Sequence, residues 1–242
     1  MAAQPSPARR AWREAAGVAI ATSAYGISFG ALAVASGLDV WQACVLSLLM
    51  FTGGSQFAFV GVIGGGGLAA AAIASAGLLG VRNVAYGMRM SPVVGDGRWR
   101  RAAASHFTID ESTAVALAQT DAAARRVGFW VTGVGIYLGW NAATLAGALL
   151  GDVLGDVRAY GLDAAAAAAF LALLWPRLRR RQAVAVGAAA AIVAAVLTPA
   201  LMPGIPVLVA ALVAVVVGWT NWWGRRDAAS AHPQDAGSET RS

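Results

Sequence analysis

The sequence predicts an all-α membrane protein: a polytopic bundle of about seven to eight helices that includes a glycine-broken or re-entrant element. Composition is the first observation behind this fold class. Of 242 residues, 58% are hydrophobic and only 12% are charged, and the mean hydropathy is +0.63. An average soluble domain has about a quarter of its residues charged. So few charges cannot coat a globule of this size, and lipid must therefore surround much of the chain.

Long uncharged runs predict the individual helices. They cover residues 15–38, 40–81, 127–151, 164–176 and 182–224. A helix needs about 20 apolar residues to cross the hydrocarbon core of a bilayer. The second and last runs are roughly twice that length, so each should hold more than one helix. In the last run, Thr198-Pro199 and Pro203-Gly204 supply a break, which predicts helices near 183–200 and 205–223.

The boundaries of the membrane domain follow from the same pattern. Residues 1–14 are predicted to be a cytoplasmic basic segment, residues 15–224 the membrane domain, and residues 225–242 a disordered polar tail in the cytoplasm. The tripeptide at 33–35 resembles a signal-peptide cleavage site, but the run before it is long enough to span, so we interpret it as a retained helix. The lone Cys44 excludes an internal disulfide.

Short clusters of arginine between the apolar runs predict the orientation. They lie at residues 9–13, 89–101, 125–126, 177–181 and 225–226, and the chain has no lysine. This pattern is typical of loops facing the cytoplasm and not of a nucleic-acid surface, so we expect an inner-membrane protein with a cytoplasmic N-terminus. An even number of crossings must then separate the clusters. That parity requires a re-entrant or broken element in the first half or around residues 104–120.

The stretch FTGGSQFAF, residues 51–59, interrupts one of the uncharged runs. Irregular backbone survives in a membrane only inside protein or beside a wet cavity. We expect Gly53 and Gly54 to open the helix, and a half-helix starting at Ser55 to offer free N–H groups to an anion. Thr52, Ser55 and Gln56 would add side-chain hydrogen bonds. The alternative is a patch of small residues that packs against another helix.

Arg82 and Asn83 follow apolar sequence directly within GVRNVAYGMRMSP. A charge inside a membrane costs several kcal/mol unless it is paired or hydrated, so it usually faces a cavity or a partner. Arg82 could hold a carboxylate through two parallel hydrogen bonds. The alternatives are a structural ion pair, or a side chain that extends to the membrane surface.

Asp110 and Glu111, within FTIDESTAVAL, are acids in an otherwise apolar setting. A carboxyl group partly shielded from water binds protons more readily than one in solution, so either could couple transport to a proton gradient or receive an amino group. Alternatively, they cap a helix, or pair with Arg82 or with the arginines at 98–101. Trp140, Asn141 and Asp163 are further polar candidates in apolar segments: the first two for substrate binding, and Asp163 for proton coupling.

Four motifs in order resemble the AzlC family of branched-chain amino-acid permeases. They are FTGGSQFAFVGVI, VRNVAYGMRMSPVVG, FTIDESTAVAL and YGLDAAAAAAFLALL, and the resemblance spans roughly residues 12–223. It implies an inner-membrane exporter of leucine, isoleucine and valine, with methionine as a further candidate, and a small hydrophobic AzlD-type partner subunit. The residues that match the motif positions are Gly53, Ser55, Gln56, Arg82, Asn83, Asp110, Glu111 and Asp163. Gly54 and Asn83 depart from the residues usual in the family, which leaves substrate preference open.

Three classes of function remain open at this point. A secondary transporter fits best, since the chain lacks the G-x-x-x-x-G-K-[ST] motif of ATP-driven machinery and no cofactor or metal is expected. Phe51, Phe57 and Trp140 would then line a pocket for the apolar side chain of the substrate. An intramembrane hydrolase would need Ser55 as nucleophile with His106 as its base. A channel or noncatalytic membrane subunit is the third possibility.

A repeat is also a possibility. Residues 26–49 and 141–174 share a helix, a short acidic turn and a second apolar helix. Transporters commonly contain such repeats. Richness in alanine alone could produce the same likeness.

Overall fold

The structure is a computed structural model that describes residues 6–154, 181–202 and 204–220, with Leu171, Trp175 and Leu178. Within these ranges the chain forms nine α-helices and no strand, as the sequence predicts. It divides into two compact units, Met1–Phe170 and Leu171–Ser242. The predictions for Asp163 and for the polar tail lie outside the described residues.

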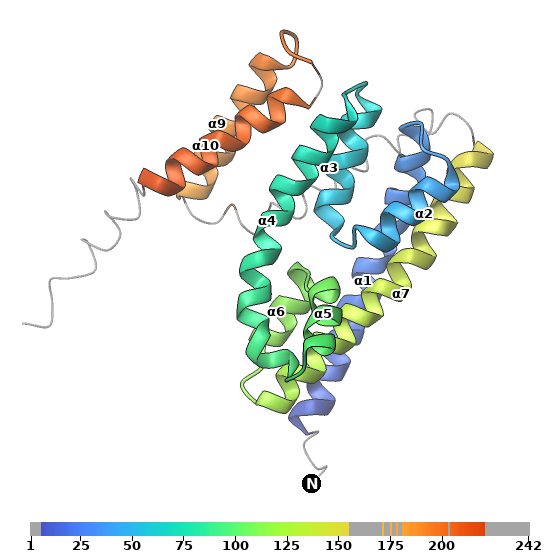
Figure 1. Cartoon of the computed structure of the whole chain (residues 1–242), viewed down its shortest axis with the longest axis vertical. Coiled ribbons are helices and arrows are strands. Elements are labelled where there is room, and N and C mark those ends of the chain that lie inside the picture. Colours follow the sequence, from blue (N-terminus) through green and yellow to red (C-terminus); the bar gives the residue numbers. More distant parts are fainter. Residues whose placement is uncertain are drawn as a thin grey trace, which may run out of the picture. The chain divides into compact units, whose positions relative to one another are not determined.

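The described part of the larger unit forms seven helices, drawn in Figure 1. They are α1 (Pro7–Ala35), α2 (Val40–Leu49), α3 (Gly53–Gly64), α4 (Ala69–Val94), α5 (Arg98–Phe107), α6 (Asp110–Ala118) and α7 (Ala122–Leu154). Of these, α1, α4 and α7 are long and apolar enough to cross a membrane. The smaller unit contains α9 (Arg181–Leu197) and α10 (Ile205–Thr220), which pack together and correspond to the two helices predicted for the last apolar run.

Helices α1 and α7 run parallel and pack closely along their length (Figure 1). Ala19 lies opposite Gly135, and Ala31 lies opposite Gly151, so the two chains advance in the same direction. A Cβ atom on Gly30 or Gly147 would overlap the backbone of the other helix. Small residues allow this approach in lipid, where helices gain no hydrophobic free energy by associating.

Helices α2 and α3 form a re-entrant hairpin. Helix α2 begins just after the end of α1 and ends at Leu49, and the chain then passes through residues 50–52 before α3 begins at Gly53. Helix α3 runs back, so that a Cβ atom on Gly64 would lie 2.5 Å from the Oγ of Ser36, in the turn after α1. Both ends of the hairpin therefore lie at one end of the unit, and its tip lies inside.

Helices α5 and α6 form a second hairpin that enters from the opposite end. Helix α5 begins beside the end of α4, where Arg100 contacts Gly95. The hairpin turns at residues 108–109. Just after α6 ends, the Nε2 of Gln119 donates to the Oε2 of Glu14 near the start of α1, at 2.9 Å. The sequence predicts one irregular element, and residues 6–154 of the larger unit contain two.

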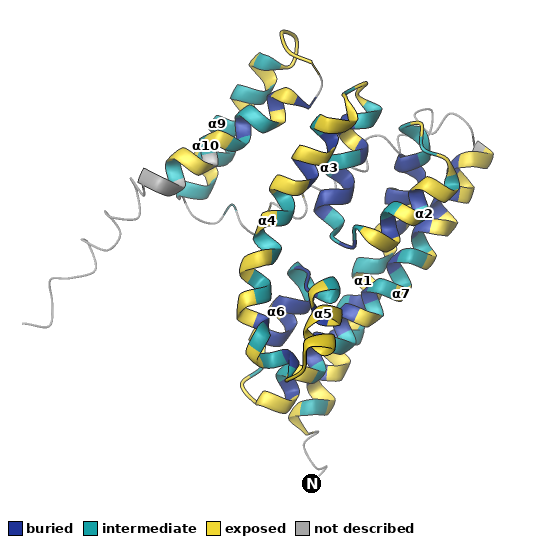
Figure 2. Ribbon diagram, viewed as in Figure 1, coloured by how far each residue is buried: buried dark blue, intermediate teal, exposed yellow. Residues whose placement is uncertain are grey.

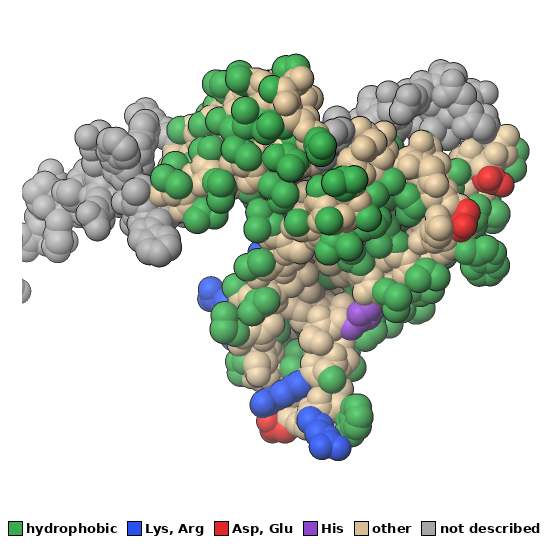
Figure 3. All heavy atoms as spheres, turned by 45° about the horizontal axis from the view of Figure 1, so that its top comes forward, with side chains coloured by type: hydrophobic (Ala, Val, Ile, Leu, Met, Phe, Trp, Pro, Cys, Tyr) green, Lys and Arg blue, Asp and Glu red, His purple; other side chains and the backbone are tan. Residues whose placement is uncertain are grey.

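The two hairpins account for the parity of the arginine clusters. Only α1 and α4 cross between the first cluster and residues 89–101, because α2 and α3 return to the end from which they start. The α5–α6 hairpin returns in the same way before residues 125–126, and the Nε of Arg126 donates to the carbonyl of Val93 at 3.2 Å. All arginine clusters of this unit therefore lie at the end where α1 begins, and Figure 3 shows blue side chains gathered there.

Apolar side chains cover much of the face of the described helices that Figure 3 shows, and Figure 2 shows exposed residues along α1, α4 and α7. Ile20, Val84 and Leu138, on the three long helices, are 76%, 65% and 64% exposed. Contiguous apolar surface on this scale is unfavourable in water and is expected where lipid is the solvent. The chain is a membrane protein.

Candidate functional site

The tips of the two hairpins meet in the interior of the larger unit. The ring of Phe51, at the first tip, lies 5.9 Å from His106 and 6.5 Å from Phe107, at the end of α5. Tyr137 of α7 closes the cluster, with its ring 5.1 Å from that of Phe51. Two interruptions of helical backbone therefore share one buried region, which is where a membrane protein can tolerate them.

The glycine pair lies in the first turn of α3, just after the unwound segment. Residues 50–52 are the non-helical ones, and Thr52 is the N-cap residue. The prediction that Gly53-Gly54 itself opens the helix is therefore wrong in position, although the break is present. These glycines leave space instead: a Cβ on Gly54 would lie 3.1 Å from an Nη of Arg82, and one on Gly53 would lie 3.6 Å from the ring of Trp140.

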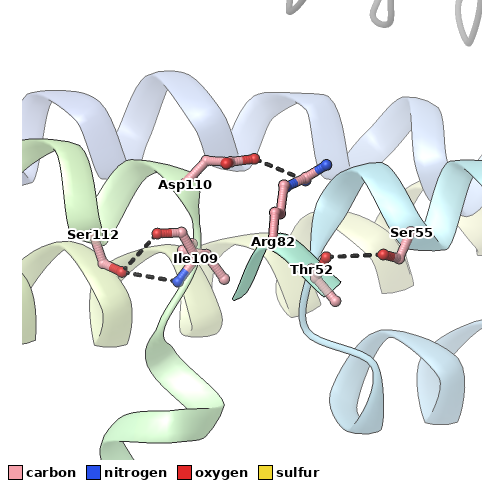
Figure 4. Close-up of polar contacts among 6 residues, drawn as sticks. All are labelled: Thr52, Ser55, Arg82, Ile109, Asp110 and Ser112. Atoms are coloured by element: carbon pink, nitrogen blue, oxygen red, sulfur yellow. Dashed lines mark hydrogen bonds and ion pairs between the residues drawn. The ribbon is translucent and has the colours of Figure 1, made fainter. Parts of the chain in front are cut away.

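Arg82 of α4 forms an ion pair with Asp110, the first residue of α6. Its Nη2 lies 2.8 Å from the Oδ2 of Asp110 (Figure 4). The two side chains remain 28% and 24% exposed. The Nε of Arg82 is buried with no hydrogen-bond partner. The ion pair that the sequence allows as an alternative is present, and it lies against the first turn of α3.

The N-termini of α3 and α6 both reach this region but differ in charge. Asp110 and Glu111 occupy the first turn of α6, where carboxylates stabilise the positive end of the helix dipole. The hydroxyl of Ser112 accepts from the backbone N–H of Ile109 at 3.0 Å (Figure 4). The first turn of α3 has no acid, and Thr52 makes no side-chain cap; its hydroxyl donates to Ser55 at 3.2 Å. Hence α3 offers an uncompensated positive end.

The described residues suit an organic ion better than a metal. No group of three or more His, Cys, Asp or Glu side chains among them is placed to hold a metal ion. Instead, one cation and one anion lie side by side next to a helix N-terminus, in a chain surrounded by lipid. That arrangement complements a small molecule with both charges, such as an α-amino acid.

Comparison with known proteins agrees with this geometry. A family model described as AzlC protein matches residues 17–154, a segment that contains both hairpins and nearly all of the three long helices of the larger unit. The chain belongs to the AzlC family. This family transports branched-chain amino acids. Searches of curated proteins and of solved structures gave no match.

Gln56 has a structural contact in this AzlC-family chain, and the substrate contact predicted for it stays a prediction. It is fully buried, and its Nε2 donates to the backbone carbonyl of Ser47 at 3.3 Å, near the end of α2. The hydroxyl of Ser47 donates in turn to Thr144 of α7 at 3.3 Å. These contacts hold the first hairpin together and attach it to α7. Ser47 and Thr144 are not among the predicted residues, because their only signal is a lone polar residue in an apolar helix.

Among the other predicted residues that the structure describes, Trp140 lies at the start of α3 and Asn83 follows Arg82 on α4. Trp140, 4% exposed, stacks with Phe29 at 6.1 Å and has its ring edge near the start of α3. The Nδ2 of Asn141 donates to the carbonyl of Tyr137 at 2.7 Å. Asn83 follows Arg82 on α4 and has a buried Oδ1 without a partner. The structure thus brings the starts of α3 and α6 together with Arg82 and Trp140.

Proposed function

We propose that this protein is the large subunit of an exporter that moves zwitterionic branched-chain amino acids outward across the inner membrane in exchange for protons. Leucine, isoleucine and valine are the substrates, with methionine as a further candidate. The observation that carries the proposal is the partly exposed ion pair between Arg82 and Asp110, held beside the uncompensated N-terminus of α3. The membership of the chain in a branched-chain amino-acid transport family supports the substrate class.

The substrate would enter by separating the ion pair. Its carboxylate would bind Arg82 and the free N–H groups at the start of α3, while its ammonium group would bind Asp110. Each charge then keeps an opposite partner throughout, which avoids the cost of several kcal/mol for an unpaired charge in a low-dielectric site. A ligand with only one of these charges would leave either Arg82 or Asp110 unpaired. The site should therefore discriminate leucine from its amide and from its deaminated acid.

Competition between the proton and the ammonium group for one carboxylate would couple the two fluxes. A protonated Asp110 has no net charge and cannot hold an ammonium group, so binding of a proton would expel the amino acid, and binding of the amino acid would expel the proton. That competition is the requirement for exchange of one solute against another. Glu111, in the same helical turn, is a second candidate for the exchanging group, and Asp163 a third.

The apolar side chain of the substrate would lie among Phe51, Phe57 and Trp140. All three are at most 5% exposed and surround the start of α3. Burial of a branched aliphatic side chain against such rings contributes about 1.5–3 kcal/mol. Since a methylene group is worth only about 0.8 kcal/mol, discrimination among leucine, isoleucine and valine should be modest.

The proposal also covers the orientation of the chain in the membrane and its partner subunit. The end with the arginine clusters would face the cytoplasm, which places the N-terminus there. A small hydrophobic AzlD-type subunit would accompany the chain, as the family resemblance implies.

Export of labelled leucine from preloaded cells tests the proposal, with and without the partner subunit. Arg82→Gln should abolish export while the protein remains in the membrane. Arg89→Gln, seven positions further along α4 and exposed, is the matched control and should export normally. Normal export by Arg82→Gln would exclude this site as the substrate site. Export that persists after the proton gradient is collapsed would exclude proton exchange.

A further inference from the structure

We infer that residues 39–94 and 97–153 are two copies of one structural unit, inserted in the membrane in opposite orientations, and that their hairpins are the gates on the two faces of the substrate site. Each copy consists of a re-entrant hairpin followed by a long helix: α2, α3 and α4 in the first, and α5, α6 and α7 in the second. The gating role rests on the proposed transport function, whereas the duplication stands on geometry alone.

The spacing of residues supports the duplication. The first arm of each hairpin is a helix of 10 residues whose second residue is an exposed tryptophan, Trp41 at 79% and Trp99 at 76%. The eighth residue of each arm is a serine. The interval from Trp41 to Asn83 is the same as that from Trp99 to Asn141, with no insertion between them. In this register Arg82 corresponds to Trp140.

In three dimensions, the long helix of each copy contacts the hairpin of the other copy. A twofold axis between the copies produces this exchange of contacts. Arg82, on the long helix of the first copy, pairs with Asp110, the first residue after the break in the second copy. Its counterpart Trp140, on the long helix of the second copy, lies against Gly53, the first residue after the break in the first copy. Each long helix therefore contacts the start of the second hairpin helix of the other copy, at positions that differ by one residue in this register. The hairpins enter from opposite ends, so the axis lies in the membrane plane.

Equivalent residues on the two long helices also share a feature: each has a buried polar atom that makes no hydrogen bond. Each of four residues has one buried polar atom without a partner: the Nε of Arg82, the Oδ1 of Asn83, the Nε1 of Trp140 and the Oδ1 of Asn141. Buried polar atoms are nearly always paired, and unpaired ones need a reason. Nine such atoms occur among the described residues, and these four lie at two pairs of equivalent positions, which we assign as two half-sites that face a common ligand. The half with Arg82 binds by charge, whereas the half with Trp140 has one neutral donor and a large apolar ring.

The two half-sites hold the two hairpins by different kinds of interaction. The ion pair holds the tip of α5–α6, the hairpin at the end with the arginine clusters, to α4. The tip of α2–α3 is held to α7 by apolar contact with Trp140 and by the buried hydrogen bond between Ser47 and Thr144. Separation of the ion pair therefore removes a contact of the hairpin on the arginine-bearing face, which then rests on its packing against α7, and leaves the contacts of the other hairpin in place.

Labelling with a membrane-impermeant thiol reagent tests the duplication. Single cysteines are placed in a Cys44→Ser background at the outer ends of each hairpin: Trp41→Cys and Leu68→Cys for the first, Asp96→Cys and Thr120→Cys for the second. All four positions are exposed. We expect the first two to label from one face and the last two from the other face only. If Trp41→Cys and Leu68→Cys label from opposite faces, α2 and α3 span the membrane as one broken helix and the inference is wrong.

A cysteine where the tips meet tests the gates. In the same background, Thr52→Cys combined with Arg82→Gln should label several-fold faster from the arginine-bearing face than Thr52→Cys alone. Combined with Arg89→Gln, its labelling should not change. An unchanged rate with Arg82→Gln would overturn the gate assignment. None of these measurements requires substrate or partner, so a correct labelling pattern without leucine export would refute the proposed function and leave the duplication intact.

Discussion

A double-mutant cycle on Arg82 and Asp110 separates a structural ion pair from one that opens for substrate. The variants are Arg82→Gln, Asp110→Asn and the two combined. Exposed ion pairs contribute less than about 1 kcal/mol to the free energy of unfolding, and removal of one partner from a buried pair costs about 3–5 kcal/mol. With about a quarter of each side chain exposed, this pair lies between those limits. We expect each single variant to lose about 2 kcal/mol.

The double variant should recover much of the stability lost by either single variant, because no unpaired charge remains. For a protein of this size, about 2 kcal/mol corresponds to a decrease of about 4–8 °C in the midpoint of thermal unfolding, which can be followed in detergent by size-exclusion chromatography. Transport should not recover. A charge-assisted hydrogen bond is worth about 1.5–3 kcal/mol, so loss of one should weaken leucine binding about 10- to 100-fold.

The two measurements together decide the role of the pair. Recovery of both stability and export in the double variant would refute the reasoning, because a pair that only holds α4 to α6 can be replaced by two neutral amides. Recovery of stability without export supports a pair that binds the zwitterion. Arg89→Gln, with an exposed charge on the same helix, controls for the loss of one arginine.

Three further predictions concern the surroundings of the site. Gly147→Ala should lower the thermal unfolding midpoint strongly, since its Cβ would overlap the backbone of α1, whereas Gly77→Ala, with nothing within 4 Å, should raise it slightly or leave it unchanged. Gln56→Leu should cost about 1–3 kcal/mol of stability by leaving the carbonyl of Ser47 buried without its donor, and Gln56→Glu, protonated in the interior, should restore part of it. His106→Ala should retain leucine export; a hydrolase with His106 as its base would lose all activity, so complete loss of function with normal membrane insertion would reopen that alternative.

Most of the fold can be predicted from the composition and from the even number of membrane crossings that the arginine clusters require. The scarcity of charge establishes lipid as the solvent, and the arginine clusters require an even number of crossings, which by itself predicts a re-entrant element. The break near Gly53 is also predictable, because paired glycines followed by Ser55 and Gln56 interrupt an apolar run. The candidate site residues Arg82 and Asp110 are predictable as well, because each is a charged residue next to apolar sequence.

Parity names residues 104–120 as one possible place for a re-entrant element, but the turn of the second break could not be located there, because nothing local marks it. The α5–α6 hairpin turns at Thr108 and Ile109, with neither glycine nor proline, and the first turns of α5 are rich in arginine, so that helix does not resemble a membrane element. The role of Gln56 was hidden for another reason. Its partner Ser47 lies on the other arm of the hairpin, and only the turn between them brings the two together.

The duplication explains why one site can be charged and apolar at once. Two equal halves related by an axis in the membrane would present equal chemistry to both faces, as in a symmetric pore. Here the equivalent positions differ: the first copy contributes Arg82, the second Trp140, and only the second break carries Asp110 and Glu111. An amino acid has the same asymmetry, with both charges at one end and an aliphatic group at the other. Divergence of two equal halves is therefore what a site on such an axis needs to bind its substrate in a single orientation.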